Sequence, residues 1–486
     1  MNGKQYLLTW AFALFVIVFN LEIKAAAPPN FIFFITDDIS VADLEAYGGP
    51  IPTPNLNKMV ASGVRFENAY VTASSCSPSR SSIITSRYPH NSGSPELHTP
   101  LPQNQWKFPG RLRRNGYYSA LSGKNHMTWN GVIDDNSRLA DAFDDIWKGG
   151  RPSGSANWVQ QLRKRPKDKP FFYWLASHDA HREWQFTEEA SRFSAEAILV
   201  PPYHYDGPET REDLAGYYHE VARTDYYLGL IFEELERQGL ADNTYVIYTS
   251  DNGRPFPRDK TRLYDSGSKV PLVISGPGVP QGKSLEALVS LIDIGPTILE
   301  LADIPIPEVF QGVSLVPLLL GRKAAVRDYI FVEHNWHTYP ANERMVRLGD
   351  WVYIRNYNYL DQNMCAESGR AIPAGKELWD AEAAGILQPE QRDIFLKPRP
   401  YEEFYNVRMD PNQFENFVNS GRYAEMLNHL RKALDVWTQD TGDTIPENPT
   451  VKIGNVNMSE RGEFPGAARN ATEIQLPGPI LRSDVE

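Results

Sequence analysis

Cysteine is scarce in this sequence, because the chain of 486 residues contains only 2, Cys76 and Cys365. Two cysteines exclude a disulfide framework and a four-cysteine metal site. They form one bridge at most, or they stay unpaired and one of them has another role.

Positive charge is also scarce, since 49 Lys and Arg residues face 61 Asp and Glu residues and the net charge is −12. This balance disfavours non-specific binding to nucleic acid or to an anionic membrane. We therefore expect no nucleic-acid partner, and any anionic ligand requires a locally basic pocket. The content of 41% hydrophobic and 23% charged residues excludes a disordered chain.

Long apolar runs are missing near the N-terminus, where a membrane anchor is the alternative to a signal peptide. The run from Leu7 to Phe19 has about 13 to 15 residues, fewer than the ~20 that span a bilayer. Lys4 precedes it, the small residues Ala25 to Ala27 follow it, and no lipoprotein-type cysteine comes next. This pattern predicts a cleaved signal peptide over residues 1–27, no membrane span, and a secreted or periplasmic protein.

Short β-rich apolar segments alternate with helix-like segments along the chain. The expected strands are 31–36, 170–176, 244–249 and 270–275, and the expected helices are 55–62, 81–85, 157–165 and 211–238. Such alternation predicts an α/β sheet with helices on both faces. Further along, 346–354 reads as a hairpin and 422–439 as an amphipathic helix. We therefore predict a catalytic domain over 28–340 and a smaller α+β subdomain with a tail over 341–486.

Polar side chains follow three of the expected strands. Asp37 and Asp38 follow the first, residues 178–181 the second, and Asp251 and Asn252 the third. Ligands of open α/β sheets bind at the carboxyl ends of strands, so these clusters are expected to converge on one site.

The segment around Cys76 carries the most specific signal. Pro78 lies near the start of an expected helix and so places Cys76 close to a helix N-terminus, where negative charge is favoured. The alternatives are a buried thiol or a bridge to Cys365. A thiolate phosphatase requires an Arg six residues after the cysteine, but that position is Ser82.

Cys76-x-Pro78-Ser79-Arg80 resembles the signature of the type I sulfatases, whose cysteine is oxidised after translation to formylglycine. Further elements resemble that family in the same order along nearly the whole mature chain. They are Asp37-Asp38, Gly123-Lys124-Asn125-His126, His181, Asp251-Asn252-Gly253, and Lys260 four residues before Tyr264. The resemblance implies an alkaline-phosphatase-like fold with a large mixed, mostly parallel sheet.

The resemblance also implies a role for each matching residue. One Ca²⁺ would be held by Asp37, Asp38, Asp251, Asn252 and the modified Cys76, and oxygen ligands of this kind suit Ca²⁺ and Mg²⁺ alike. Arg80 would hold the modified residue, and Lys124 and Lys260 would bind the sulfate oxygens. His126 would accept a proton from the hydrated aldehyde, and His181 would act at the leaving-group oxygen. A formylglycine-generating or anaerobic sulfatase-maturating enzyme is the implied partner.

The run Ser177-His178-Asp179-Ala180-His181-Arg182 resembles the His-Asp-Pro-His-Arg run of the sulfamidases, the heparan N-sulfatases. Departures from the family pattern fall at Ala180, Asn125 and Ser86, and none removes an implied metal ligand or sulfate contact. The first hypothesis is a secreted O-sulfatase acting on a sulfated polysaccharide or oligosaccharide, such as algal ulvan. The alternative is an N-sulfoglucosamine sulfohydrolase acting on heparan-type glycans.

Sugar-reading residues are expected on the loops. The candidates are His178, Asp179, Arg182, Glu333, His334, His337 and Arg344, beside Lys124, His181 and Lys260 at the sulfate. Two other classes are less compatible with the sequence. A phosphatase or phosphodiesterase of the same superfamily uses Ser or Thr with zinc, and the histidines here do not suit two zinc sites. A non-catalytic glycan-binding descendant would have lost Cys76 or a metal carboxylate.

Overall fold

The computed structural model describes residues 27–129, 134–446, 450, 480 and 482–485. The predicted signal peptide lies outside these residues except for Ala27. Within them, no helix combines the length and the apolar character needed to cross a membrane.

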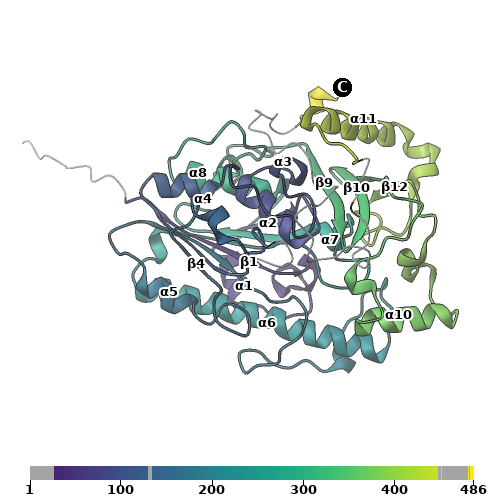
Figure 1. Cartoon of the computed structure of the whole chain (residues 1–486), viewed down its shortest axis with the longest axis horizontal. Coiled ribbons are helices and arrows are strands. Elements are labelled where there is room, and N and C mark those ends of the chain that lie inside the picture. Colours follow the sequence, from purple (N-terminus) through teal and green to yellow (C-terminus); the bar gives the residue numbers. More distant parts are fainter. Residues whose placement is uncertain (1–26, 130–133, 447–449, 451–479, 481, 486) are drawn as a thin grey trace, which may run out of the picture.

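A large sheet forms the centre of the molecule (Figure 1). It has eight strands in the order β4-β3-β5-β1-β6-β7-β2-β8. Its strands are β1 (Asn30–Thr36), β2 (Gly63–Tyr70), β3 (Tyr118–Gly123), β4 (Asp145–Trp147), β5 (Phe171–Ala176), β6 (Thr244–Ser250), β7 (Lys269–Ser275) and β8 (Lys283–Ser290). Strand β7 pairs antiparallel with β6 and β2, and the other pairs are parallel. The predicted mixed, mostly parallel sheet is confirmed.

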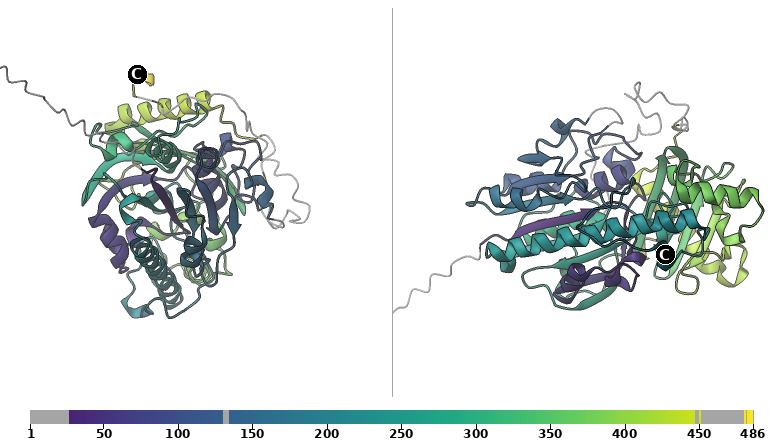
Figure 2. Two further views of the ribbon diagram at one scale, coloured as in Figure 1. Left: turned by 90° about the vertical axis from the view of Figure 1, so that its left-hand side faces the viewer. Right: turned by 90° about the horizontal axis from the view of Figure 1, so that it is seen from below.

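Both faces of this sheet are buried, which explains the continuous apolar runs of its strands. In β1, Phe31, Phe33 and Ile35 face one core, while Ile32 and Phe34 face the other. Helices α2 (Cys76–Thr85), α4 (Phe108–Arg114), α8 (Ile294–Leu301) and α9 (Val316–Leu319) pack on the first face, and α1 (Pro54–Ala61), α5 (Trp158–Lys164) and α6 (Pro208–Arg237) on the second. Figure 2 shows α6 running along the sheet.

A second, antiparallel sheet lies beside the first, with the strand order β12-β11-β10-β9. Its strands are β9 (Tyr329–His337), β10 (Tyr339–Leu348), β11 (Trp351–Asn356) and β12 (Glu402–Asn406). Helix α11 (Ala424–Thr441) packs against it through Leu430, Leu434 and Trp437. The remaining α-helices of the described chain are α3 (Pro89–Ser92), α7 (Asp265–Ser268) and α10 (Pro373–Ala383). This sheet begins at β9, ahead of residue 341, and the boundary at 340/341 stays a prediction.

The local expectations hold with two differences. The helix expected at 81–85 begins at Cys76, because its whole length is buried and it lacks the apolar stripe by which a helix is recognised. The strand expected at 270–275 forms as β7 but runs antiparallel, since an apolar run does not encode strand direction.

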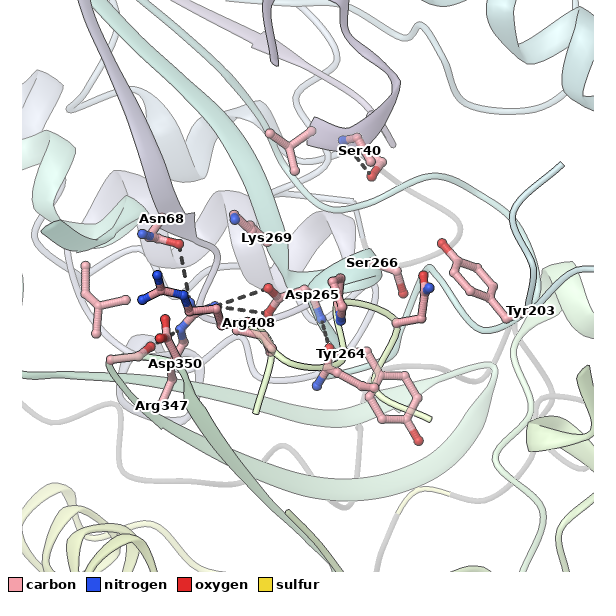
Figure 3. A pocket seen from close by; sticks show the side chains of 18 of the residues that line it. Ser40, Asn68, Tyr203, Tyr264, Asp265, Ser266, Lys269, Arg347, Asp350 and Arg408 are labelled. Atoms are coloured by element: carbon pink, nitrogen blue, oxygen red, sulfur yellow. Dashed lines mark hydrogen bonds and ion pairs between the residues drawn. The ribbon is translucent and has the colours of Figure 1, made fainter. Parts of the chain in front are cut away.

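One buried ion pair joins the two sheets. Arg347 of β10 donates from Nη1 to Asp265 Oδ2 at 3.1 Å, and Tyr70 of β2 donates to Asp265 Oδ1 at 2.9 Å. Asn68 accepts from Arg347 at 3.3 Å. Figure 3 shows Asn68, Asp265 and Arg347 in the wall of a cavity of about 770 Å³.

Replacing Asp265 with Ala is expected to lower the free energy of unfolding by roughly 3 kcal/mol, because it leaves the Arg347 guanidinium buried without its carboxylate. Urea denaturation measures this change. Asp361→Ala is the matched control, since Asp361 pairs with Lys397 at an exposed position and such pairs contribute about 0–1 kcal/mol. Equal losses in the two variants would contradict a bridging role for Asp265.

Candidate functional site

Three strand ends build the floor of the candidate site. Strands β5, β1 and β6 are neighbours in the sheet, so the polar residues that follow them lie side by side. Asp37 N donates to Asp179 O at 2.8 Å, and Asp38 N donates to the Asp251 carboxylate at 3.1 Å. The expected convergence of the three clusters is what the structure shows.

Helix α2 brings Cys76 to this floor. Cys76 is the first residue of the helix, after the extended Ser75, and its Sγ lies 3.7 Å from Asp38 Oδ1. Burial raises the pKa of the Cys76 thiol well above its usual value, even though Lys124 and Lys260 act to lower it. Cys76 thus lies at a helix N-terminus as expected, and burial outweighs the nearby cations and favours the neutral thiol.

The alternative of a bridge between the two cysteines is excluded. Both are free and buried, and Cys365 Sγ contacts Ser368 Oγ at 3.0 Å. Cys76 is thus available for modification.

The buried acidic groups fit a hard divalent cation. One atom from each of Asp37, Asp38, Cys76 and Asp251 lies within 4.8 Å of the others. Asn252 joins them by donating to Asp38 Oδ1 at 2.6 Å. In the described part of the chain, Asp37 Oδ1 and Asn252 Oδ1 accept no hydrogen bond although both are buried. Buried oxygens without a donor suit a metal ion, and this donor set is rich in oxygen.

Three cations balance the three carboxylates. Arg80 Nε donates to Asp251 at 2.7 Å, and Lys260 Nζ donates to Asp38 at 2.6 Å. Lys124 Nζ contacts Asp37. Added divalent charge would leave the site positive, which favours an anionic ligand. The predicted residues Arg80, Lys124 and Lys260 therefore meet at one point, where they neutralise the three carboxylates in a chain whose net charge is −12.

The electrostatic environment shifts the pKa values of two of these carboxylates, Asp37 and Asp251, in opposite directions. Burial acts to raise the pKa of Asp37, but Lys124, His181 and Arg80 outweigh it and hold that pKa well below its usual value. At Asp251 burial outweighs Arg80 and raises the pKa to about 7.

Two histidines face the same cavity. Neither ring nitrogen of His126 has a hydrogen-bond partner among the described residues. Burial, followed by Lys124 and His98, lowers the pKa of His126 well below the usual value. His181 lies at the exposed mouth, where its Nδ1 donates to Arg182 O at 2.6 Å. Desolvation by the surrounding protein, followed by Lys260 and Lys124, lowers the pKa of His181. Both imidazoles are therefore neutral near pH 7.

A cavity of about 590 Å³ opens above Cys76. Of the predicted residues it is lined by Cys76, Lys124, His126, His178, His181 and His337. Sequence reasoning missed other residues of this wall, including Leu97, His98, Trp129, Trp147, Lys148 and Glu367. They come from separate loops and carry no motif, so only the fold brings them together. The larger cavity of Figure 3 contains none of the predicted site residues.

Several predicted sugar-reading residues have other contacts. Asp179 is buried and accepts from Arg223 at 2.7 and 2.8 Å, and Glu333 accepts from His90 N at 3.0 Å. Arg344 donates to Asp443 at 2.5 Å. None of these three residues lines the cavity above Cys76, although Asp179 lines a neighbouring cavity of about 370 Å³. Their charges are paired within the fold, and a sugar contact by Asp179, Glu333 or Arg344 stays a prediction.

Arg182 and His334 are also held by the protein. Arg182 pairs with Asp213, donates from Nε to Pro255 O at 3.1 Å, and lines a neighbouring cavity of about 370 Å³ with His178 and His181. His334 is 2% exposed and contacts Glu343 at 3.4 Å, outside the cavity wall. A sugar contact by Arg182 or His334 stays a prediction.

Comparison with known proteins identifies the family. The sulfatase family model matches residues 29–304, more than half of the chain. The chain belongs to the sulfatase family. A second model, the C-terminal part of N-sulphoglucosamine sulphohydrolase, matches residues 256–363. This sulfatase is a sulfuric ester hydrolase, and the sulfamidase-like resemblance noted from its sequence is confirmed.

Two relatives match most of this sulfatase. Human N-sulphoglucosamine sulphohydrolase is 28% identical over 463 residues, which cover 87% of this chain and 92% of the relative. An ulvan-active sulfatase of Formosa agariphila is 27% identical over 492 residues, covering 88% and 78%. A solved structure, described as a complex with its substrate D-glucosamine-2-N,6-O-disulfate, superposes with a TM-score of 0.66 at 20% identity, covering 87% of this chain and 99% of that one.

Adding Ca²⁺ or Mg²⁺ to the chelated protein is expected to raise its melting temperature, because a cation relieves repulsion among Asp37, Asp38 and Asp251. At one hundred times its Kd, such a ligand adds about 2.7 kcal/mol to the stability. Differential scanning calorimetry measures the shift. Asp37→Asn should remove most of it, whereas Glu286→Gln, at an exposed position outside the site, should retain it. A wild-type protein that does not respond to either ion would refute the assignment.

Proposed function

We propose that this sulfatase removes sulfate esters from a sulfated carbohydrate outside the cytoplasm, after oxidation of Cys76 to formylglycine and with Ca²⁺ bound. One observation supports the proposal above all. Cys76 starts a helix at a buried cluster of three carboxylates, and Arg80, Lys124 and Lys260 surround the same point.

Neutralising the substrate is the first requirement, because a sulfate ester is an anion that repels nucleophiles. Lys124 and Lys260 would turn their ammonium groups to the sulfate oxygens, and Arg80 would hold residue 76 in place while it remains bound to Asp251. In a site closed to water these charges act more strongly than in solution.

Asp37, Asp38, Asp251 and Asn252 would hold the cation, with residue 76 as a further ligand. Formylglycine and the cation together supply a nucleophilic oxygen and the charge that activates it. A neutral thiol in this position would not, which agrees with the raised pKa of Cys76.

The two histidines divide the proton transfers. Neutral His126 would accept a proton from the hydroxyl of residue 76, since neither of its ring nitrogens is engaged. His181 donates from Nδ1 to Arg182 O, so its Nε2 is the atom left for the leaving-group oxygen. Nε2 can donate only when the imidazole is protonated. Bound sulfate would offset the charges of Lys260 and Lys124 and so raise the pKa of His181 toward protonation.

Carbohydrate as the substrate is supported by the relatives, whose names and descriptions refer to N-sulphoglucosamine, ulvan and a glucosamine disulfate. The cavity also suits a sugar, because the rings of Trp129 and Trp147 offer apolar surface beside polar groups. Export through the predicted signal peptide over residues 1–27 would bring the enzyme to extracellular polysaccharide such as ulvan.

A sulfamidase acting on N-sulfoglucosamine is the second candidate. It is favoured by the match of residues 256–363 to the C-terminal part of that enzyme and by the run from Ser177 to Arg182. The zinc phosphatases of the superfamily are less compatible, because the acidic cluster at Cys76 contains no histidine.

Replacing Cys76 with Ala should abolish sulfate release without unfolding the protein, because the nucleophile comes from this residue alone. Sulfate release is measured by ion chromatography on O-sulfated oligosaccharides and on N-sulfoglucosamine, which also separates the two candidate substrates. Mass spectrometry of the wild-type peptide containing residue 76 should show the aldehyde after co-expression with a maturing enzyme. Full activity of Cys76→Ala would refute the formylglycine hypothesis.

Replacing His181 with Ala should lower kcat/KM for a sugar sulfate by roughly 10²–10⁴-fold, the range of general acid catalysis. The loss should be much smaller for an aryl sulfate with an acidic phenol, since that leaving group departs without a proton. Wild-type kcat/KM for the sugar sulfate should fall as the pH rises through the pKa of His181, because only the protonated form donates. Equal losses on both substrates would argue against proton donation by His181.

A further inference from the structure

One carboxylate in the cavity above Cys76 has no function in the chemistry described so far. Glu367 belongs to η7 (Ala366–Ser368), which reaches the site from outside the large sheet. It is 6% exposed and lines the cavity.

Glu367 lacks the partners that a buried carboxylate needs. Its Oε2 accepts no hydrogen bond within the described residues, and its Oε1 lies 3.7 Å from Lys260 Nζ, beyond hydrogen-bond distance. Burial acts to raise the pKa of Glu367, but Lys260 and His337 outweigh it and hold that pKa at about 2. The group is thus a charged acceptor, and its Oε2 is left without a donor among the described residues, which a ligand could supply.

The position of Glu367 relative to Lys260 indicates which part of a bound substrate would lie beside the Glu367 carboxylate. Lys260 lies between two carboxylates, 2.6 Å from Asp38 on the metal side and 3.7 Å from Glu367 on the cavity side. A sulfate bound by Lys260 would therefore place the neighbouring substituent of its sugar beside Glu367. The apolar side chains of Leu97 and Trp129 line the same cavity.

We propose that Glu367 is a specificity-determining residue, which accepts a hydrogen bond from a hydroxyl or ammonium group next to the scissile sulfate and rejects a second sulfate or carboxylate there. The substrate class is accordingly a sugar that carries a single sulfate with a hydrogen-bond donor beside it. This inference rests on the proposed function in one respect, the binding of sulfate by Lys260.

Two physical effects act in the same direction. A hydroxyl or ammonium group satisfies the buried carboxylate, whereas a second anionic group meets a like charge and leaves it unsatisfied. If Glu367 were only a counter-ion of Lys260, the outcome would differ. Replacing Glu367 would then change the Kd of every sulfated ligand by the same factor.

Binding to the Ca²⁺-loaded Cys76→Ala protein tests this inference without turnover. The probes are methyl hexosides that carry one sulfate, each matched with the vicinal disulfate, and isothermal titration calorimetry gives the Kd. We expect at least tenfold tighter binding of the better monosulfate than of its vicinal disulfate. Glu367→Gln in the same background should reduce this ratio at least fivefold. Glu367→Asp, which keeps the charge, should preserve most of it, and Glu286→Gln should leave it unchanged.

The inference is overturned if Glu367→Gln changes the Kd of both probes by one common factor, or if neither probe binds the Cys76→Ala protein. Equal melting temperatures of the variants exclude misfolding as the cause. Failure of the proposed function gives a distinct result. The mature protein would then release no sulfate from sugar or aryl sulfates, while the Cys76→Ala protein would still bind the monosulfate more tightly than the vicinal disulfate.

Discussion

The burial of opposite charges in equal number is the constraint on which this structure depends. Asp37, Asp38 and Asp251 lie at the centre of the molecule, where an isolated carboxylate would be strongly destabilising. Arg80, Lys260 and Lys124 make their burial possible. Each of these cations also serves the proposed chemistry, because an anionic substrate and a divalent cation meet the same groups. Stability and function are therefore two uses of one charge arrangement, in a chain whose net charge is −12.

That arrangement explains unusual features of the local sequence. Helix α2 is buried on all sides, so it cannot have the polar face of a surface helix. Small residues such as Ser77, Ser79 and Ser82 allow it to lie between the strand ends and its neighbours, while Arg80 reaches from it to Asp251. A helix of this composition has little apolar surface, and the ion pair contributes to fixing its place in the core.

The sequence predicted those parts of the molecule whose residues are constrained locally. Strands buried on both faces produce apolar runs, and groups that follow adjacent strand ends meet, so the floor with Asp37, Asp38 and Asp251 was predictable. The direction of β7 was not, because both directions bury the same residues. The cavity wall was not predictable either. Glu367 and Trp129 line the same cavity as Cys76 only through tertiary packing. Glu333 and Arg344, which the sequence placed on loops, lie instead in strands β9 and β10 and form an ion pair inside the fold.

The division between floor and wall has a consequence for how substrate preference changes within such a fold. The cations of the floor are coupled to the core, since Lys260 and Arg80 neutralise buried carboxylates and cannot be exchanged without destabilising it. The wall residue Glu367 is less tightly coupled, because it lies 3.7 Å from Lys260 and its Oε2 accepts no hydrogen bond within the described residues. A substitution at Glu367 or Trp129 alters what lies beside the sulfate while the buried charges stay paired. On the proposed function, one pocket for sulfate could therefore serve different sugars, because the wall residues can change while each buried carboxylate of the floor keeps its cation.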